Sequence, residues 1–340
     1  MLRRLLTVLS LLGLLGLINV AEARPIVIKL GTIAPEGSIW HDALLQLRQR
    51  WHELSDGRVE LRIYAGGVLG GEDEMIRKIQ RRGLDAVAIS GSGLPTIDRS
   101  AGSFNLPLLF TSYEELDFVR SHLAATLEAR FERRHFKVLN WAEGGWVYFF
   151  SKKPVRTPDD LRHLRLWIAA GDPDSERIFK DFGFQVVPLP ATDMLTSLQS
   201  GLIEVVDVPP LFALLDRSYQ AAPYMTDLRW APLNAATVIG LHAWQRIPPR
   251  DRPALLQAAR EAGRRLRSAL RQAEQEAIRE MQARGLTIIE LDAATRQIWQ
   301  REAEAAWPRL RGTLIEPELY DQIMKWHRVW QSRIAAPARR

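Results

Sequence analysis

The chain has 340 residues, of which 46% are hydrophobic and 25% charged, values of ordinary globular proteins that exclude global disorder and a fibrous repeat. Its length predicts about two domains. The absence of Cys excludes disulfides, thiolate zinc sites, iron–sulfur clusters, cysteine nucleophiles and a lipoprotein acylation site. The 46 Lys and Arg residues are scattered among 40 Asp and Glu residues rather than gathered in one stripe, so no nucleic-acid partner is expected.

Residues 1–23 have the features of a secretory signal peptide. Arg3 and Arg4 precede a Leu-rich run, and Ala21-Glu22-Ala23 forms a small-x-small cleavage site. The apolar run is short for a membrane span of roughly 20 residues, which makes an uncleaved anchor the weaker alternative. The mature chain is therefore expected to begin at Arg24 and to reside in a bacterial periplasm.

Alternating strands and helices are predicted at the start of the mature chain. Apolar residues at every second position predict strands at 26–30 and 59–63, and a short apolar run predicts a buried strand at 86–90. Apolar residues at steps of three and four predict helices over 38–54 and 72–82. This β-α-β-α-β order is typical of a doubly wound parallel sheet.

The same order recurs after residue 150, which predicts a second lobe built like the first. A helix-start signal lies at 157–161, and Gly201 ends the last helix of the unit. The predicted strands are 164–168, 185–189 and 204–208, and the predicted helices are 174–182 and 193–200.

A long helix is predicted over 251–283, because one stripe of it carries Leu255, Ala259, Ala262, Leu266, Ala269, Ala273, Ala277 and Met281. Its length of roughly 50 Å is enough to run along both lobes. The Ala-rich stripe favours packing on the protein's own body over the alternative, a coiled-coil seam. The remaining chain is predicted to form short helices whose tryptophans fill the core: Trp299, Trp307, Trp326 and Trp330.

Ligands of doubly wound sheets gather at the carboxyl ends of the strands, so the loops that follow the strands predict the pocket. These loops are 32–38, 65–71 and 91–93 in the first lobe, and 169–172, 188–192 and 209–212 in the second. Two such rims facing each other form a cleft. Candidate ligand contacts in and beside them are Glu36, Ser90, Trp146, Trp167, Asp172, Asp207 and Phe212.

Other chemistry finds little support in the sequence. Asp85, Glu204, Asp207 and Asp172 have no spacing that fixes two carboxylates on one face, so solvated or hydrogen-bonded roles are expected. The seven His residues form no metal-binding motif, and no metal or cofactor is expected. The Gly-rich stretch 65–71 lacks a phosphate-loop pattern, and Ser90 lacks the surroundings of a nucleophile elbow, although it can still hydrogen-bond a ligand.

Several motifs in order along the mature chain resemble one known family, the periplasmic solute-binding proteins of TRAP transporters, of the DctP type. They are Gly31-Thr32-Ile33-Ala34-Pro35-Glu36-Gly37-Ser38, Ser55-Asp56-Gly57-Arg58, Leu69-Gly70-Gly71-Glu72, Gly83-Leu84-Asp85-Ala86, Leu106-Pro107-Leu108-Leu109-Phe110, Ser151-Lys152-Lys153-Pro154-Val155, Thr157-Pro158-Asp159-Asp160-Leu161 and Leu198-Gln199-Ser200-Gly201-Leu202-Ile203-Glu204. Each motif alone is weak, but their order is specific.

The resemblance implies an α/β, type II-like clamshell with a helix-flanked sheet in each lobe and the long helix spanning both. The expected first lobe comprises 24–145 and about 235–275, and the second 146–234 and about 276–335. The family captures small solutes, typically organic acids, and delivers them to the small and large subunits of a TRAP permease.

The resemblance also places the family's ligand-binding positions on this chain. Trp167 falls where the family's main carboxylate-binding Arg stands, Trp146 at a second Arg, and Val208 at an Asn. Because Trp offers one neutral donor where Arg offers a charged fork, a dicarboxylate held in the usual way is not expected. A ring-bearing or cationic ligand is one hypothesis, and a carboxylate held by another Arg is the alternative.

The leading hypothesis for function is a non-enzymatic solute receptor that feeds a permease. Two alternatives remain open: a secreted enzyme on a two-lobed scaffold, and a receptor that feeds a sensor. An enzyme should show a nucleophile–base set or a metal cluster, and none is legible in the sequence.

Overall fold

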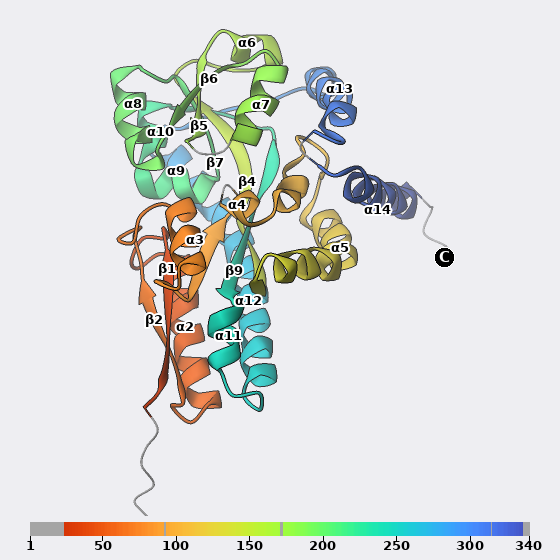
Figure 1. Cartoon of the computed structure of the whole chain (residues 1–340). Coiled ribbons are helices and arrows are strands. Elements are labelled where there is room, and N and C mark those ends of the chain that lie inside the picture. The colour runs from red at the N-terminus through yellow and green to blue at the C-terminus, as the bar shows by residue number, and fades with distance from the viewer. Residues whose placement is uncertain (1–23, 92, 171–172, 314, 336–340) are drawn as a thin grey trace, which may run out of the picture.

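The computed structural model describes residues 24–91, 93–170, 173–313 and 315–335, which form two lobes stacked along one axis (Figure 1). The predicted export signal at 1–23 lies outside the described residues. In each lobe helices flank a β-sheet, and one long helix runs past both. The two-lobed α/β architecture predicted from the sequence is therefore confirmed.

The first lobe begins with the predicted alternation of strands and helices. Helix α2 starts after Ser38, whose Oγ accepts a hydrogen bond from the His41 N–H at 3.3 Å, and it buries Leu44, Leu47 and Trp51. The elements are β1 (Ile26–Thr32), α2 (Ile39–Leu54), β2 (Val59–Tyr64), α3 (Glu72–Gln80), β3 (Ala86–Ser90), α4 (Leu94–Ile97), the 3-10 helix η1 (Arg99–Asn105) and α5 (Tyr113–Arg133).

The second lobe repeats that order, as predicted. Thr157 and Asp160 form a capping box at the start of α6, and Gly201 ends α8 with φ of 81°, a conformation that favours glycine. The elements are α6 (Pro158–Arg162), β5 (Arg165–Ala169), α7 (Pro173–Asp181), β6 (Gln185–Leu189), η2 (Ala191–Asp193), α8 (Met194–Ser200), β7 (Val205–Val208), α9 (Pro210–Asp216), α10 (Ser218–Ala221) and β8 (Tyr224–Thr226).

Two long strands that the sequence analysis missed, β4 (Phe136–Ser151) and β9 (Ala231–Gly240), pass from one lobe to the other. They pair antiparallel along most of their length. Nearly every residue of β4 is buried, so the strand lacks the apolar alternation by which the shorter strands were predicted.

The strands follow the order β2-β1-β3-β9-β4-β7-β5-β6, with β8 pairing β4 and β10 (Thr287–Ile289) pairing β8. Strand β1 runs parallel to β2 and β3, and β5 runs parallel to β6 and β7. Strand β9 is antiparallel to β3, and β4 is antiparallel to β7. The parallel strands of each lobe therefore flank one antiparallel pair, β4 and β9.

Helix α12 (Arg252–Ala283) follows β9 and the short α11 (Leu241–Arg246), and its 32 residues span about 48 Å. It packs against α2, β4 and α9, which confirms the prediction that it lies along the protein's own body. The predicted stripe is partly correct. Its ends are buried at Leu255 and Met281, but Leu266 is only half-buried and the stripe also buries a carboxylate, Glu274.

The C-terminal helices α13 (Ala293–Leu310) and α14 (Pro317–Ala335) have 18 and 19 residues, so the prediction of short helices was wrong. Trp299 and Trp307 fill the core as predicted, whereas Trp326 and Trp330 are only half-buried beside α5.

The boundaries expected for the lobes assign α14 to the second lobe. Helix α14 lies beside α5, an element of the first (Figure 1). His327 Nδ1 of α14 lies 2.8 Å from Glu115 Oε1 of α5. The boundaries themselves remain a prediction.

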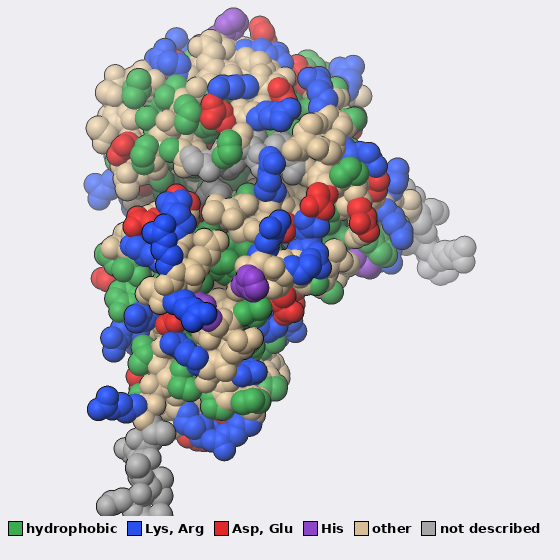
Figure 2. Space-filling model, in the orientation of Figure 1, with side chains coloured by type: hydrophobic (Ala, Val, Ile, Leu, Met, Phe, Trp, Pro, Cys, Tyr) green, Lys and Arg blue, Asp and Glu red, His purple; other side chains and the backbone are tan. Residues whose placement is uncertain are grey.

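Basic and acidic side chains are interspersed over the face shown in Figure 2. Within the described part of the chain, every helix is too short or too polar to cross a membrane.

Trp299 should contribute strongly to the stability of the second lobe. It is 1% exposed, stacks on Phe149 with ring centroids 5.9 Å apart, and donates its indole N–H to the Arg156 carbonyl at 2.8 Å. We expect Trp299→Ala to lower the free energy of unfolding by about 3–5 kcal/mol in urea titrations. Its exposed neighbour is the control: Ile298→Ala should cost under about 1 kcal/mol. Similar losses in both variants would contradict the packing described.

Candidate functional site

A cavity of about 320 Å³ lies where the two lobes meet. The first lobe contributes the end of β1 from Thr32 to Pro35 and the end of β3, and the second contributes the ends of β5 and β7. The crossing strands β4 and β9 line it between the lobes. The cavity therefore lies at the carboxyl ends of parallel strands from both lobes, where the sequence placed the pocket.

Four of the seven candidate ligand contacts line the cavity: Ser90, Trp167, Asp207 and Phe212. Glu36 is exposed on a loop whose neighbours Ala34 and Pro35 reach the wall, but Glu36 is not part of the wall. Asp172 lies outside the described residues. Ligand contact by these residues stays a prediction, and the geometry favours the four on the wall.

Trp167 presents an apolar surface to the cavity. It lies in β5 and is 8% exposed. Its indole N–H donates to the Leu189 carbonyl at 3.1 Å, so this donor is already used within the second lobe. Trp167 can therefore offer a ligand its ring, through stacking or apolar contact.

Ser90 is tied to a carboxylate that the sequence analysis did not single out, Glu72. The Ser90 N–H and Oγ–H donate to the two carboxylate oxygens of Glu72 at 2.7 and 2.9 Å. Glu72 is the first residue of α3, a position that favours a carboxylate, and it also lines the cavity. The sequence signal that could have identified Glu72 was its position at the start of a predicted helix, directly after Gly70 and Gly71.

Trp146, a candidate contact, lies off the cavity wall. It is fully buried and packs on Tyr113 at the start of α5, with ring centroids 5.3 Å apart. Trp141 also points toward α5, where it contacts Phe131. In a regular strand residues 141 and 146 would lie on opposite faces, because they are an odd number of positions apart. A β-bulge between Glu143 and Gly145 inserts one residue and reverses the alternation of faces, so Trp146 turns from the cavity and Val147 lines it.

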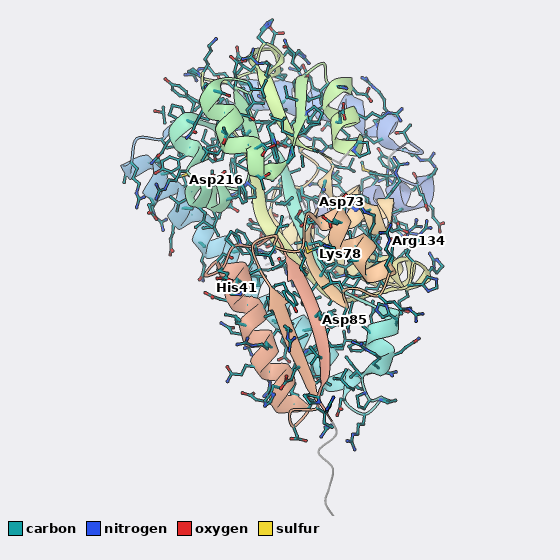
Figure 3. The ribbon with its side chains drawn as sticks, turned by 60° about the vertical axis from the view of Figure 1, so that its left-hand side comes forward. His41, Asp73, Lys78, Asp85, Arg134 and Asp216 are labelled. Atoms are coloured by element: carbon teal, nitrogen blue, oxygen red, sulfur yellow. The ribbon has the colours of Figure 1, made fainter. Side chains whose placement is uncertain are left out.

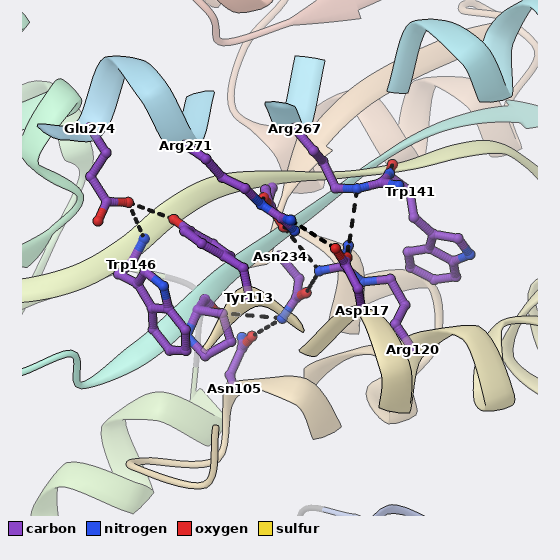
Figure 4. A network of polar contacts seen from close by, with 12 residues as sticks. Asn105, Tyr113, Asp117, Arg120, Trp141, Trp146, Asn234, Arg267, Arg271 and Glu274 are labelled. Atoms are coloured by element: carbon purple, nitrogen blue, oxygen red, sulfur yellow. Dashed lines mark hydrogen bonds and ion pairs between the residues drawn. The ribbon is translucent and has the colours of Figure 1, made fainter. Parts of the chain in front are cut away.

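The arginines at the crossing are bound to internal acceptors (Figure 4). Glu143 in β4 is fully buried and accepts from Arg120 Nη2 at 3.2 Å and from Arg271 Nε at 2.7 Å. Arg271 also donates to Asp117 at 2.8 Å, and Arg120 to Asn234 at 3.1 Å. Because each guanidinium is committed to a partner, neither offers its charge to the cavity.

Two further arginines near the crossing are committed in the same way. Arg267 of α12 donates to the Trp141 carbonyl at 2.6 Å. Arg229 donates to the Thr111 carbonyl at 3.3 Å and to the Tyr148 hydroxyl at 3.4 Å, and lies over the Trp146 ring. Across the described ranges no Lys or Arg lines the cavity, and its charged side chains are Glu72 and Asp207.

Glu274 of α12 joins the long helix to the bulge of β4 (Figure 4). Its carboxylate accepts from the Trp146 N–H at 3.1 Å, the Tyr113 hydroxyl at 2.5 Å and the Tyr148 hydroxyl at 3.4 Å. Burial raises the pKa of the Glu274 carboxyl above its ordinary value, against the lowering effect of these donors.

The other carboxylates considered in the sequence have structural partners. Asp85 lies in the lower part of the first lobe (Figure 3), accepting from the Lys29 N–H at 2.8 Å and from Arg246 at 2.9 Å. Glu204 accepts from the Arg165 N–H at 3.2 Å. The hydrogen-bonded roles predicted for both are confirmed. Within the described ranges, no cluster of His, Asp and Glu is arranged to hold a metal ion.

Comparison with known proteins identifies the family. Residues 30–312 match the DctP family, described as bacterial extracellular solute-binding protein family 7. The chain belongs to this family. The resemblance found in the sequence is thus confirmed, and the family consists of solute-binding receptors rather than enzymes.

Individual relatives in the DctP family are distant. A solute-binding protein of Roseobacter denitrificans is 23% identical over 290 residues, covering 85% of this chain and 89% of the relative. The 2,3-diketo-L-gulonate-binding periplasmic protein YiaO of Escherichia coli is 23% identical over 254 residues, 73% of this chain and 76% of its own. The sugar acid binding protein DctPAm of Advenella mimigardefordensis, solved with galactonate, superposes with a TM-score of 0.84 at 18% identity, covering 91% and 99% of the two chains.

The buried Glu274 carboxylate should make stability depend on pH. Its pKa is raised in the folded state, so the native chain keeps this proton while the unfolded chain loses it, and stability falls as pH rises above about 4.3. Glu274→Gln keeps an oxygen acceptor without the charge. The difference in Tm between Glu274→Gln and wild type should therefore shift in favour of the variant by roughly 2–8 °C when the pH is raised from 4 to 7.

The exposed Glu276 on the same helix supplies the control, since Glu276→Gln should leave the pH profile unchanged. A Glu274→Gln variant that loses stability relative to wild type as the pH rises would contradict the destabilising effect assigned to the buried charge.

Proposed function

We propose that the chain captures a small solute in the cavity between its lobes, in the periplasm, and passes it to the small and large subunits of a TRAP permease. The single observation that carries the proposal is that both lobes and the strands joining them line one cavity. A solute in that cavity contacts both lobes at once, so it stabilises the closed arrangement by its differential affinity for it. Membership in a family of extracellular solute-binding proteins supports the same role.

Any motion between the lobes would have to bend the segments that join them. Strands β4 and β9 cross between the lobes, and α12 packs on elements of both. Bending at these segments would move the β3 end, with Ser90, toward the β5 end, with Trp167. The closed form would then present one continuous surface to a permease.

The ligands of two relatives are acids, but the cavity of this chain lacks the charge that would bind an acid. YiaO is named for 2,3-diketo-L-gulonate, and DctPAm was solved with galactonate, both sugar acids. In the described residues of this chain, the cavity wall offers no cationic side chain to a carboxylate. We therefore propose that this chain captures its solute without the carboxylate-binding Arg that the resemblance implies for the family.

Native mass spectrometry of the protein purified from its own periplasm tests the capture role. Wild type should carry a small molecule that denaturation releases. Ala191→Trp, at an exposed position on the cavity wall, should reduce the occupied fraction at least tenfold by filling the mouth. Ala125→Trp, exposed on α5 away from the cavity, should retain the molecule. Wild type without a bound molecule, or equal occupancy in all three proteins, would refute capture in this cavity.

Uptake distinguishes a permease from a sensor as the partner. Cells lacking the permease subunits should fail to accumulate the molecule released from wild-type protein, while cells carrying them accumulate it. Accumulation that does not depend on the permease subunits would refute delivery to them.

A further inference from the structure

The cavity continues from the inter-lobe cleft into the first lobe, as a crevice between α2 and α12. Its walls there are small or aliphatic side chains: Ala43, Leu44 and Leu47 of α2, and Ala262, Gly263 and Leu266 of α12. Alanines of the sheet, Ala88 and Ala142 among them, form its floor. At Gly263 the missing side chain lets α12 approach β4 closely, since a Cβ there would lie 2.8 Å from the Asn140 Cβ. The open volume of about 320 Å³ lies beside this contact and is lined by small and aliphatic side chains.

Two polar side chains interrupt this apolar surface, Asn140 of β4 and Thr237 of β9. They are direct partners in the antiparallel register, and both line the cavity. Asn140 is 7% exposed and Thr237 is 4% exposed. Neither side chain makes a hydrogen bond within the described part of the protein, although most buried polar groups of folded proteins do.

The amide of Asn140 and the hydroxyl of Thr237 face the cavity side by side without a hydrogen bond to the described protein, so they can bond a polar ligand group that displaces water from them. An amide both donates and accepts, and so does a hydroxyl. Together they match a ligand hydroxyl, carbonyl or amide. They offer no charge to balance an ionised group.

The charges of the cavity wall disfavour an anion. Among the described residues its charged side chains are the carboxylates Glu72 and Asp207, and the nearby guanidiniums of Arg120 and Arg271 are bound to Glu143. A carboxylate ligand would lose its hydration without gaining a cationic partner, which disfavours its binding in an apolar cavity.

We propose that Asn140 and Thr237 anchor the polar group of an uncharged solute whose apolar body extends through the cavity toward Trp167. The inference rests on the proposed capture function and specifies its ligand class: an uncharged molecule with one hydroxyl, carbonyl or amide group and an aliphatic or ring-bearing body. Trp167 suits the apolar end because its only donor is already used by Leu189. The other end of the solute meets the Asn140–Thr237 pair.

Binding of three probes of equal chain length tests this ligand class: decanol, decylamine and decanoate, titrated into the mature chain by calorimetry. Decanol should bind at least tenfold more tightly than decanoate and more tightly than decylamine. Affinity for decanoate or for decylamine equal to or above that for decanol would overturn the proposal, and so would an absence of binding by all three probes to folded protein.

Thr237→Val tests the anchor, because it exchanges a hydroxyl for a methyl group of similar shape. The variant should bind decanol about three- to tenfold more weakly, the loss of one hydrogen bond. Its Tm should equal or exceed that of wild type, since no protein partner loses a bond. Thr126→Val, exposed on α5, is the matched control and should change neither quantity. Unchanged decanol affinity in Thr237→Val would overturn the anchor.

The molecule carried by the purified protein separates the two proposals. If wild type carries a cavity-bound sugar acid or dicarboxylate, the capture function stands and the uncharged ligand class is refuted. If wild type carries no molecule, the capture function itself fails.

Discussion

The buried ion pairs at the crossing of the two lobes constrain the rest of this structure. Glu143, on the strand that joins the lobes, is fully buried and is balanced by Arg120 and Arg271 from two different helices. Removing Glu143 would leave the two guanidiniums without this buried counter-charge, at a cost of about 3–5 kcal/mol. The pairs therefore hold β4, α5 and α12 in one arrangement, and they do so beside a bulge that reverses which face of β4 each residue occupies.

The character of the cavity follows from that constraint. Arginines that lie near the junction are used to balance internal carboxylates or to cap backbone carbonyls, so the space between the lobes is walled by apolar side chains, two carboxylates and a few neutral polar groups. The chain retains the fold of a solute-capturing family, but no Lys or Arg that could hold a carboxylate lines the described part of the cavity wall. Within the described residues, the side chains of Asn140 and Thr237 line the crevice without a hydrogen bond to the protein, and we propose that they bond a polar group of the solute.

Local sequence patterns were sufficient for the elements whose burial differs between two faces. The β-α units of both lobes, the Gly201 helix end and the long helix 252–283 appear as predicted. Patterns failed where burial is complete: β4 shows no alternation because both of its faces are covered. Of the site, Ser90, Trp167, Asp207 and Phe212 followed from strand ends. Trp146 did not, because its direction depends on a bulge that no local residue pattern marks, and Asn140 and Thr237 became candidates only when the register of β4 and β9 placed them side by side.

We propose that the cavity recognises an uncharged polar group at its deep end and an apolar body along its length. A crystal structure of the mature chain with decanol carrying a terminal bromine tests it most directly, because anomalous scattering locates the bromine independently of the rest of the ligand. The account predicts the hydroxyl within roughly 3 Å of the Asn140 or Thr237 side chain and the bromine on the Trp167 side of the cavity. A ligand outside the cavity, or one whose hydroxyl has drawn Arg120 or Arg271 away from Glu143, would contradict it.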